Sequence, residues 1–205
     1  MWLTFLSELY RLTKTDALII TDIQIDFLPG GALPVPEANK IIPVINSYIR
    51  HFKTAQAQII ASRDWHSANH ISFKPQGGPW PPHCVQDTAG ARFSSELKLP
   101  PNSLIISKAT NPNHEAYSAF DRTNLTDELS KRKVKRLFVS GLATDYCVLN
   151  TVLDGCRLDF KTIVLMDATM GINVKSGDVE RAVESMQKKG ATLATETDFP
   201  DATDT

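Results

Sequence analysis

Short runs of apolar residues recur along the chain, and each run ends at or beside a polar residue. They cover residues 17–21, 58–62, 104–107, 137–140 and 162–166, with a weaker run at 191–194. Each run is apolar at consecutive positions, so both of its faces are suited to burial. Strands of this kind occur in parallel sheets that are covered on both sides. The pattern therefore predicts a buried parallel sheet of five strands, with the run at 191–194 as a candidate sixth strand.

Helical patterns separate these runs. Apolar residues recur at helical spacing in 38–53, and further helical patterns cover 125–131, 145–158 and 178–189. Gly190 follows the last of them, at a position where glycine commonly ends a helix. The alternation of strands and helices predicts an α/β fold of three layers, with the parallel sheet between two layers of helices.

A chain of 205 residues is long enough for one such domain. We expect the domain at 16–197, after an N-terminal extension at 1–15 and before a polar tail at 198–205 that is poorly ordered. Apolar residues at positions 2, 5, 6, 9 and 12 predict a short helix in the extension. The extension lacks the basic region with which a signal peptide begins, and Glu8 and Arg11 interrupt its apolar residues. No apolar run is long enough to span a bilayer. We therefore expect a cytoplasmic protein without a membrane partner.

Composition excludes two further classes of protein. Hydrophobic residues make up 42% of the chain and charged residues 22%, which is typical of a globular domain rather than a disordered one. Lys and Arg number 22 against 23 Asp and Glu, so no excess of positive charge attracts nucleic acid. The three cysteines are an odd set without a CxxC pair, which favours a reducing compartment over a disulfide scaffold.

The stretch at 63–101 has neither the strand nor the helix period. It contains the aromatic and imidazole side chains of Trp65, His66, His70, Trp80 and His83, among several prolines. Loops of this length in compact domains are usually functional or disordered. The aromatic content argues against disorder, so the pattern predicts a functional loop.

Reactive side chains follow the predicted strands. Asp22, Asp64 and Lys108 follow the first three, and Cys147 lies in the turn after the fourth. Open α/β sheets bind ligands outside the carboxyl ends of their strands. The sequence therefore predicts one site, built from these four residues, at that edge of the sheet.

Three of them have the chemistry of a nucleophile and its support. A thiol at the start of a helix, as expected for Cys147, is acidified by the helix N–H groups. Asp22 can exchange a proton with it, and Lys108 favours the thiolate. Each residue also has a structural interpretation: a small buried apolar residue for Cys147, a cap for Asp22 and an exposed strand-edge cation for Lys108. Their coincidence at one edge favours the catalytic interpretation.

Asp64, His66 and His83 are a candidate metal-binding set. Residues i and i+2 of an extended segment point to the same side, so Asp64 and His66 can bind one ion, with His83 joining from the far end of the loop. Two imidazoles and a carboxylate suit zinc, iron or manganese. The other histidines are interpreted as ordinary surface or loop residues: His51, His70 and His114.

Two aromatic residues lie near these groups in the sequence. Phe27 follows Asp22 closely, and Trp80 stands three residues before His83 in the segment GGPWP. Flat side chains near a reactive cysteine suit a planar ring as substrate. Packing in the hydrophobic core is the alternative for both.

Five segments of the chain resemble, in order, the nicotinamidases of the isochorismatase-like hydrolase family. The resemblance covers residues 16–195, nearly the whole chain. The segments are TDIQIDFLPGGALPVP, ASRDWHSANHISF, GGPWPPHCVQDTAGARF, ISKATNPNHEAYSAF and GLATDYCVLNTVLDG.

The resemblance implies the strand order 3-2-1-4-5-6, which places the first and fourth strands side by side. It also implies a cis peptide bond between Leu142 and Ala143, and an oxyanion hole formed by the backbone N–H groups of Ala143 and Cys147. The implied catalytic triad is Asp22, Lys108 and Cys147. The implied metal ligands are Asp64, His66 and His83. The implied substrate-binding residues are Phe27, Trp80 and Tyr117.

The activity implied by the resemblance is hydrolysis of nicotinamide to nicotinic acid and ammonia through a cysteine thioester, in NAD salvage. Pyrazinamide, which keeps the ring nitrogen, is an expected second substrate, and benzamide an expected poor one. One divalent ion is expected, zinc first and iron or manganese as alternatives. Another small-amide hydrolase of the family and a ligand-binding protein without hydrolytic activity are the alternative functions. The sequence leaves the oligomeric state open, with a homo-oligomer as one alternative.

Overall fold

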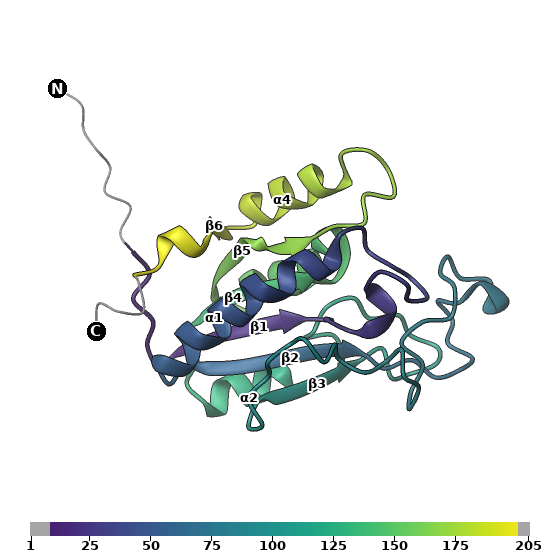
Figure 1. Ribbon diagram of the computed structural model, residues 1–205, viewed down its shortest axis with the longest axis horizontal. Coiled ribbons are helices and arrows are strands. Elements are labelled where there is room, and N and C mark those ends of the chain that lie inside the picture. Colours follow the sequence, from purple (N-terminus) through teal and green to yellow (C-terminus); the bar gives the residue numbers. More distant parts are fainter. Residues whose placement is uncertain (1–8, 201–205) are drawn as a thin grey trace.

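Six parallel strands form the centre of the computed structural model, which describes residues 9–200 (Figure 1). Their order across the sheet is β3-β2-β1-β4-β5-β6, as the resemblance implies. The strands are β1 (Asp16–Thr21), β2 (Gln58–Asp64), β3 (Leu104–Lys108), β4 (Arg136–Leu142), β5 (Lys161–Met170) and β6 (Thr192–Ala194). The central strand β1 pairs with β2 and β4, so the chain reverses its direction of winding there.

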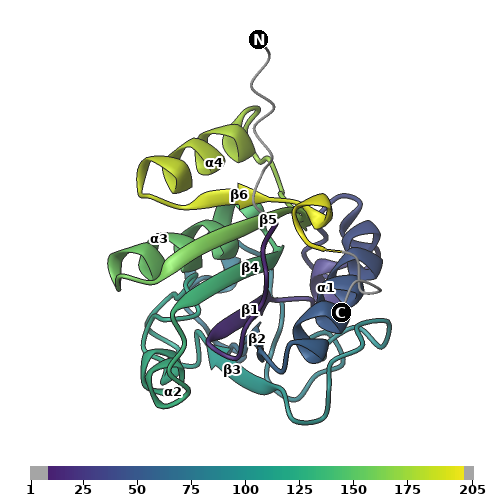
Figure 2. The same cartoon turned by 90° about the vertical axis from the view of Figure 1, so that its left-hand side faces the viewer.

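Helices cover both faces of the sheet. One face is covered by α1 (Ile42–Thr54). The other is covered by α2 (Leu125–Lys131), α3 (Leu149–Arg157) and α4 (Asp178–Lys188), and Figure 2 shows the two groups on opposite sides of the strands. The predicted three-layer α/β fold is confirmed.

The apolar strands explain this arrangement. Successive side chains of a strand point to opposite faces. On β1, Leu18 and Ile20 pack with the residues of α1, whereas Ala17 and Ile19 pack with α2, α3 and α4. All four side chains are fully buried, so the apolar middle of β1 contributes to the cores on both faces of the sheet.

Several element boundaries differ from the predicted ones. The predicted helix at 38–53 begins with a short 3₁₀ turn, Ala38–Ile41, and the α-helix α1 starts only at Ile42. Pro43 lies in the first turn of α1, a position that proline favours. A π-helical segment, Thr144–Val148, precedes α3, so Cys147 lies in this wider turn rather than at the start of an α-helix.

The expectations for the chain ends are partly wrong. Residues 9–13 carry no helix, and the rest of the helix predicted for the extension lies outside the described residues. The first part of the predicted tail is packed rather than loose: Phe199 is buried against Tyr10, Tyr48 and Phe138. Among residues 9–200, no helix is long and apolar enough to cross a membrane.

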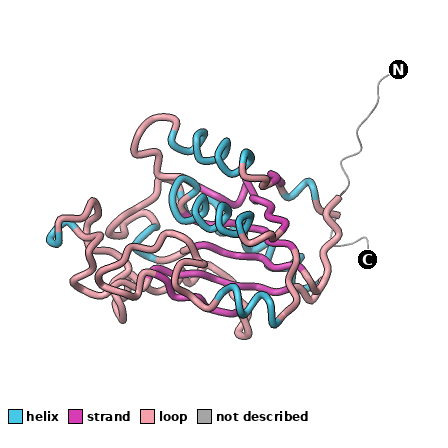
Figure 3. The backbone as a smooth tube through the Cα atoms, turned by 180° about the vertical axis from the view of Figure 1, so that it is seen from behind, coloured by secondary structure: helices cyan, strands magenta, loops and turns pink. Residues whose placement is uncertain are grey.

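The long loop between β2 and β3 lies at the carboxyl ends of the strands. Figure 3 shows the loops crowded at this end of the sheet. Backbone hydrogen bonds fasten the loop to the sheet, since Trp65 N–H donates to the Lys108 carbonyl at 3.0 Å and His66 N–H to the Cys84 carbonyl at 3.0 Å. The loop is thus an ordered part of the domain.

Candidate active site

Asp22, Lys108 and Cys147 lie together at the carboxyl ends of the strands β1, β3 and β4. Asp22 follows β1 directly and has a left-handed backbone, with φ at 52°. Aspartate tolerates this conformation better than most residues, and it turns the carboxylate off the strand. Lys108 is the last residue of β3, and Cys147 lies in the π-helical segment after β4. All three are buried.

The Lys108 ammonium is the centre of the group. Its Nζ lies 2.9 Å from Asp22 Oδ2 and 3.3 Å from Cys147 Sγ, and it also donates to an Asp64 carboxylate oxygen. The Ser62 hydroxyl donates to the other Asp22 oxygen at 2.7 Å. One buried cation therefore holds two carboxylates and the thiol within reach of one another.

Burial and charge shift the pKa values of these groups. Burial raises the pKa of the Asp22 carboxyl, although Lys108 opposes the shift. Burial also raises the pKa of the Cys147 thiol, again against Lys108. Burial alone would lower the pKa of Lys108, but the two carboxylates outweigh it and raise that pKa well above its ordinary value. The cation therefore persists, and the resting thiol needs a base, for which Asp22 is within reach.

Asp64, His66 and His83 form a compact buried cluster beside this group. One possible ligand atom from each lies within 4.8 Å of the others. Asp64 ends β2, His66 follows two residues later, and His83 comes from the far part of the loop, where its Nε2 lies 3.9 Å from Asp64 Oδ2. The structure thus brings together the three predicted ligands.

The hydrogen bonds of the two imidazoles fit a metal cation. His66 Nδ1 bonds to the His83 carbonyl at 3.1 Å, and His83 Nδ1 to the Pro81 carbonyl at 2.8 Å. A carbonyl only accepts, so Nδ1 carries the proton and Nε2 of the neutral ring keeps its lone pair. The Nε2 atom of His66 is buried without a hydrogen-bond partner. A divalent ion between the Nε2 atoms and Asp64 would satisfy this group.

His70 and Glu115 adjoin this cluster and were not predicted there. The interpretation of His70 as an ordinary surface or loop residue is wrong: it is fully buried, with its ring centroid 4.4 Å from that of His66. Burial alone would lower the pKa of His66, but Glu115 and Asp64 outweigh it and raise that pKa. The negative charge that attracts a proton there also favours a cation. The spacing of four residues between His66 and His70 is the one signal in the sequence.

A buried glutamine, also not predicted, fixes the position of Asp64. The Gln24 side chain accepts from the Asp64 N–H at 2.8 Å and donates to the Asp64 carbonyl at 2.8 Å. It also donates to the Ala91 carbonyl at 2.9 Å, which ties the loop to the ends of β1 and β2. A short polar side chain two residues after Asp22 gives no sequence signal for this role.

The three predicted substrate-binding aromatics line one small cavity of about 30 Å³. Trp80 Nε1 donates to the Tyr117 hydroxyl at 3.0 Å, and Phe27 lies 5.5 Å from the His83 ring. The cavity also reaches the groups of the site, and its complete lining is Phe27, Leu33, Val35, Asp64, Trp80, His83, Tyr117, Ala143, Tyr146, Cys147 and Ile172. A space of this size holds about one water molecule, so a ring enters only as side chains move apart.

Ala143 lies at the start of the π-helical segment. Its peptide bond with Leu142 is cis, as the resemblance implies. Its carbonyl accepts from the N–H groups of Tyr146 and Val148, at 3.0 and 3.1 Å. The first N–H groups of a helical segment have no partner within it, so those of this turn can serve an anion beside Cys147.

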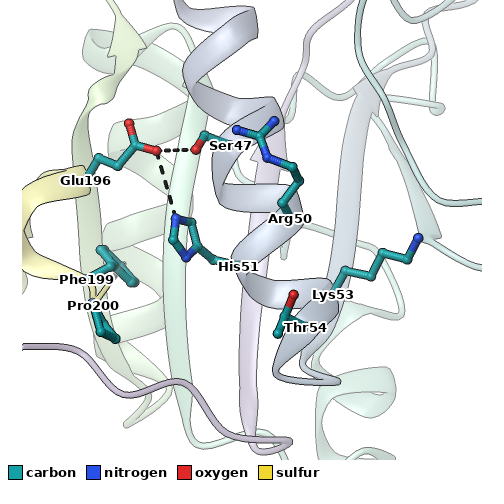
Figure 4. Close-up of a pocket in the computed structure, with 8 residues that line it drawn as sticks. All are labelled: Ser47, Arg50, His51, Lys53, Thr54, Glu196, Phe199 and Pro200. Carbon is teal, nitrogen blue, oxygen red and sulfur yellow. Dashed lines mark hydrogen bonds and ion pairs between the residues drawn. The ribbon is translucent and has the colours of Figure 1, made fainter. Parts of the chain in front are cut away.

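A second pocket, with a volume of about 670 Å³, lies between α1 and the segment after β6 (Figure 4). None of the residues of the candidate active site lines it. There Ser47 donates to the Glu196 carboxylate, and His51 Nε2 lies 3.9 Å from the same carboxylate. Of the other histidines, His114 forms a half-exposed pair with Asp121 at 2.9 Å. His51 and His114 thus lie outside the candidate site.

Comparisons with known proteins find similar chains over most of the length of this one. A nicotinamidase of Escherichia coli is 38% identical over 204 residues, which cover 89% of this chain and 96% of that protein. The crystal structure of pyrazinamidase of Pyrococcus horikoshii in complex with zinc has 52% identity and a TM-score of 0.85, covering 88% of this chain and 99% of its own. PnC1 from L. infantum in complex with nicotinate has 33% identity and a TM-score of 0.85, covering 92% and 98%.

The family model described as the isochorismatase domain matches residues 16–198. This match spans every strand of the sheet and all the residues of the candidate site. The chain therefore belongs to the isochorismatase family.

Proposed function

We propose that the protein hydrolyses nicotinamide to nicotinic acid and ammonia, with Cys147 as nucleophile and a divalent ion bound at Asp64, His66 and His83. The observation that carries the proposal is the buried group in which Lys108 contacts Asp22, Asp64 and Cys147 beside a cavity lined by aromatic rings. The nicotinamidase and pyrazinamidase relatives support this substrate class.

In the first half of the reaction, Asp22 takes the proton of the Cys147 thiol, and the sulfur attacks the carboxamide carbon. The carbonyl oxygen becomes an oxyanion, which the backbone N–H groups of Ala143 and Cys147 stabilise. Lys108 keeps the charged pair favourable. Asp22 then gives its proton to the leaving amine, which departs as ammonia and leaves a thioester on Cys147.

In the second half, a water molecule attacks the thioester carbon. Asp22 accepts a proton from this water and returns it to the sulfur as nicotinic acid is released, so the enzyme regains its starting state. Phe27, Trp80 and Tyr117 hold the ring against the site. When bound, a divalent ion supplies a Lewis acid that can hold the ring nitrogen and orient a water molecule.

Zinc is the ion that we propose first, since two imidazoles and a carboxylate with open positions are typical of catalytic zinc, and a zinc complex is known for the P. horikoshii relative. Pyrazinamide keeps the ring nitrogen and is proposed as a second substrate. Benzamide lacks this nitrogen and should react poorly.

The test is ammonia release by the purified protein from nicotinamide, pyrazinamide and benzamide, before and after chelation. We expect rapid release from the first two amides, slow release from benzamide, and loss of activity with the chelator that zinc restores. No release from nicotinamide by the metal-loaded protein would refute the proposed activity. Full activity after complete removal of the metal would refute the role of the ion alone.

A further inference from the structure

The loop between β5 and α4 is fastened to the turn that carries Cys147. The Asp145 carboxylate accepts from the Ile172 N–H at 2.9 Å through one oxygen and from the Asn173 N–H at 2.7 Å through the other. Asp145 stands two residues before Cys147 in the π-helical segment. The loop lies at the same end of the sheet as the candidate site (Figure 1).

The fastened residue forms a wall of the ring cavity. Ile172 lines this cavity together with Tyr146, Ala143 and Cys147. The cavity is small, so a displacement of Ile172 changes the space available to a substrate. Asp145 itself does not line the cavity.

The fit of the loop is tight at the residue before Ile172. A Cβ atom added to Gly171 would lie 2.2 Å from Val179 Cγ2 and 3.1 Å from Asp145 Oδ1. The backbone at this point therefore passes closely between α4 and the Asp145 carboxylate. A second fastening lies at the far end of the loop, where Asp178 accepts from the Lys175 N–H at 2.7 Å.

We propose that Asp145 is a positioning residue, which holds Ile172 against the ring cavity and so limits the size of the molecule that reaches Cys147. The inference rests on the proposed function as far as the substrate is concerned. The alternative role for Asp145 is a favourable negative charge at the start of a helical segment, which needs no contact with the loop.

A double-mutant cycle separates these roles. The variants are Asp145→Asn, Ile172→Ala and both together, with Asp178→Asn as the matched control that loosens the other end of the loop. Asn keeps the shape of Asp145 but offers one acceptor where two N–H groups point. We expect Asp145→Asn to raise the KM for nicotinamide about tenfold, because Ile172 is then no longer held against the ring, with kcat changed less than about threefold.

If Asp145 acts through Ile172, the double variant has a KM no higher than that of the more affected single variant. The proposal would be overturned if the rise of KM in the double variant equalled the product of the rises in the two single variants. So would a lower kcat at unchanged KM in Asp145→Asn, or an equal rise of KM in Asp178→Asn.

A second readout does not depend on turnover. The rate of alkylation of Cys147 is measured by peptide mapping with iodoacetamide and with the bulkier N-ethylmaleimide. We expect the ratio of the N-ethylmaleimide rate to the iodoacetamide rate to rise in Asp145→Asn and in Ile172→Ala but not in Asp178→Asn. An unchanged ratio in Asp145→Asn would refute the positioning role, even if nicotinamide proved not to be the substrate.

Discussion

At the scale of single residues, the proposed chemistry depends on the buried ammonium group of Lys108. Lys108 is fully buried and lies against two carboxylates and a thiol, so its charge compensates groups that burial would otherwise keep neutral. Asp22 and Cys147 both have raised pKa values, with burial as the main cause. One carboxylate oxygen of Asp22 and the sulfur of Cys147 lie within 4.8 Å of each other, so a proton can pass between the two groups.

The role of Asp22 as a proton carrier is tested by Asp22→Asn. The amide is nearly isosteric but cannot accept the thiol proton or protonate the leaving amine. Loss of a general acid and base costs about 10²–10⁴ in rate, so kcat should fall at least a hundredfold. Metal content should stay as in the wild type, and the melting temperature is measured on the same sample to establish that the variant is folded. Near-normal kcat in a stable variant would leave Asp22 as a structural residue.

The hydroxyl of Ser62 should tune the pH dependence. Asp22 must be unprotonated to act as base, so kcat/KM falls as the pH drops through its pKa. Ser62 donates to the charged carboxylate and thereby lowers this pKa. Ser62→Ala removes this hydrogen bond. The acid limb of the plot of kcat/KM against pH should therefore move to higher pH by about one unit.

The matched control for this shift is Ser140→Ala. Ser140 is also buried in the sheet, but its hydroxyl donates to the Ile19 carbonyl at 3.3 Å and not to a carboxylate. In Ser140→Ala, the acid limb of the plot of kcat/KM against pH should stay where it is in the wild type. A shift toward lower pH in Ser62→Ala would show that another group controls the limb.

At the scale of elements, the long loop between β2 and β3 does what its composition predicts: it forms one side of the site. The loop supplies His66 and His83 from its two ends, and Gln24 fastens its middle through the Ala91 carbonyl. A metal ion bound to both histidines and to Asp64 would cross-link the loop to β2.

Removal of one ligand should therefore affect both metal and loop. His83→Ala should lower the affinity for zinc by more than the roughly 10–100-fold typical of losing an outer-shell partner. Backbone amides of the loop at 65–101 should exchange hydrogen faster, as they should in the wild type after chelation. His114→Ala, outside the cluster, is the control. Full zinc content in a double variant of His66 and His83, measured by elemental analysis, would exclude these ligands.

At the scale of the whole molecule, the sheet could be predicted from local patterns because both of its faces are apolar. The helix at 125–131 has the predicted bounds, and the strand cores lie where the apolar runs are. The order of strands came from the resemblance, since periodicity carries no information on which strands are neighbours. The contacts of Gln24, Asp145, Tyr146 and Ile172 could not be predicted, because they join loops that are far apart in the sequence.

The stability of the sheet is tested at the beginning of its two central strands. Asp16, which is fully buried, accepts from Arg136 Nε at 2.6 Å and from Nη2 at 2.7 Å, and so joins β1 to β4. Arg136→Ala leaves this carboxylate without its cation and should lower the free energy of unfolding by about 3 kcal/mol in urea titrations. Arg157→Ala, which breaks an exposed pair with Asp154, should change it little. If Arg136→Ala lowered the free energy of unfolding as little as Arg157→Ala, the pair of Arg136 with Asp16 would not stabilise the sheet.

The most direct test of the proposed chemistry is ammonia release from nicotinamide by Cys147→Ala, with zinc content and nicotinamide binding measured on the same sample. The account predicts a loss of more than about 10³-fold in kcat, with metal content and binding close to those of the wild type. Cys156→Ala, which changes a cysteine outside the site, should keep full activity. Ammonia release by Cys147→Ala at a rate near that of the wild type would contradict the account.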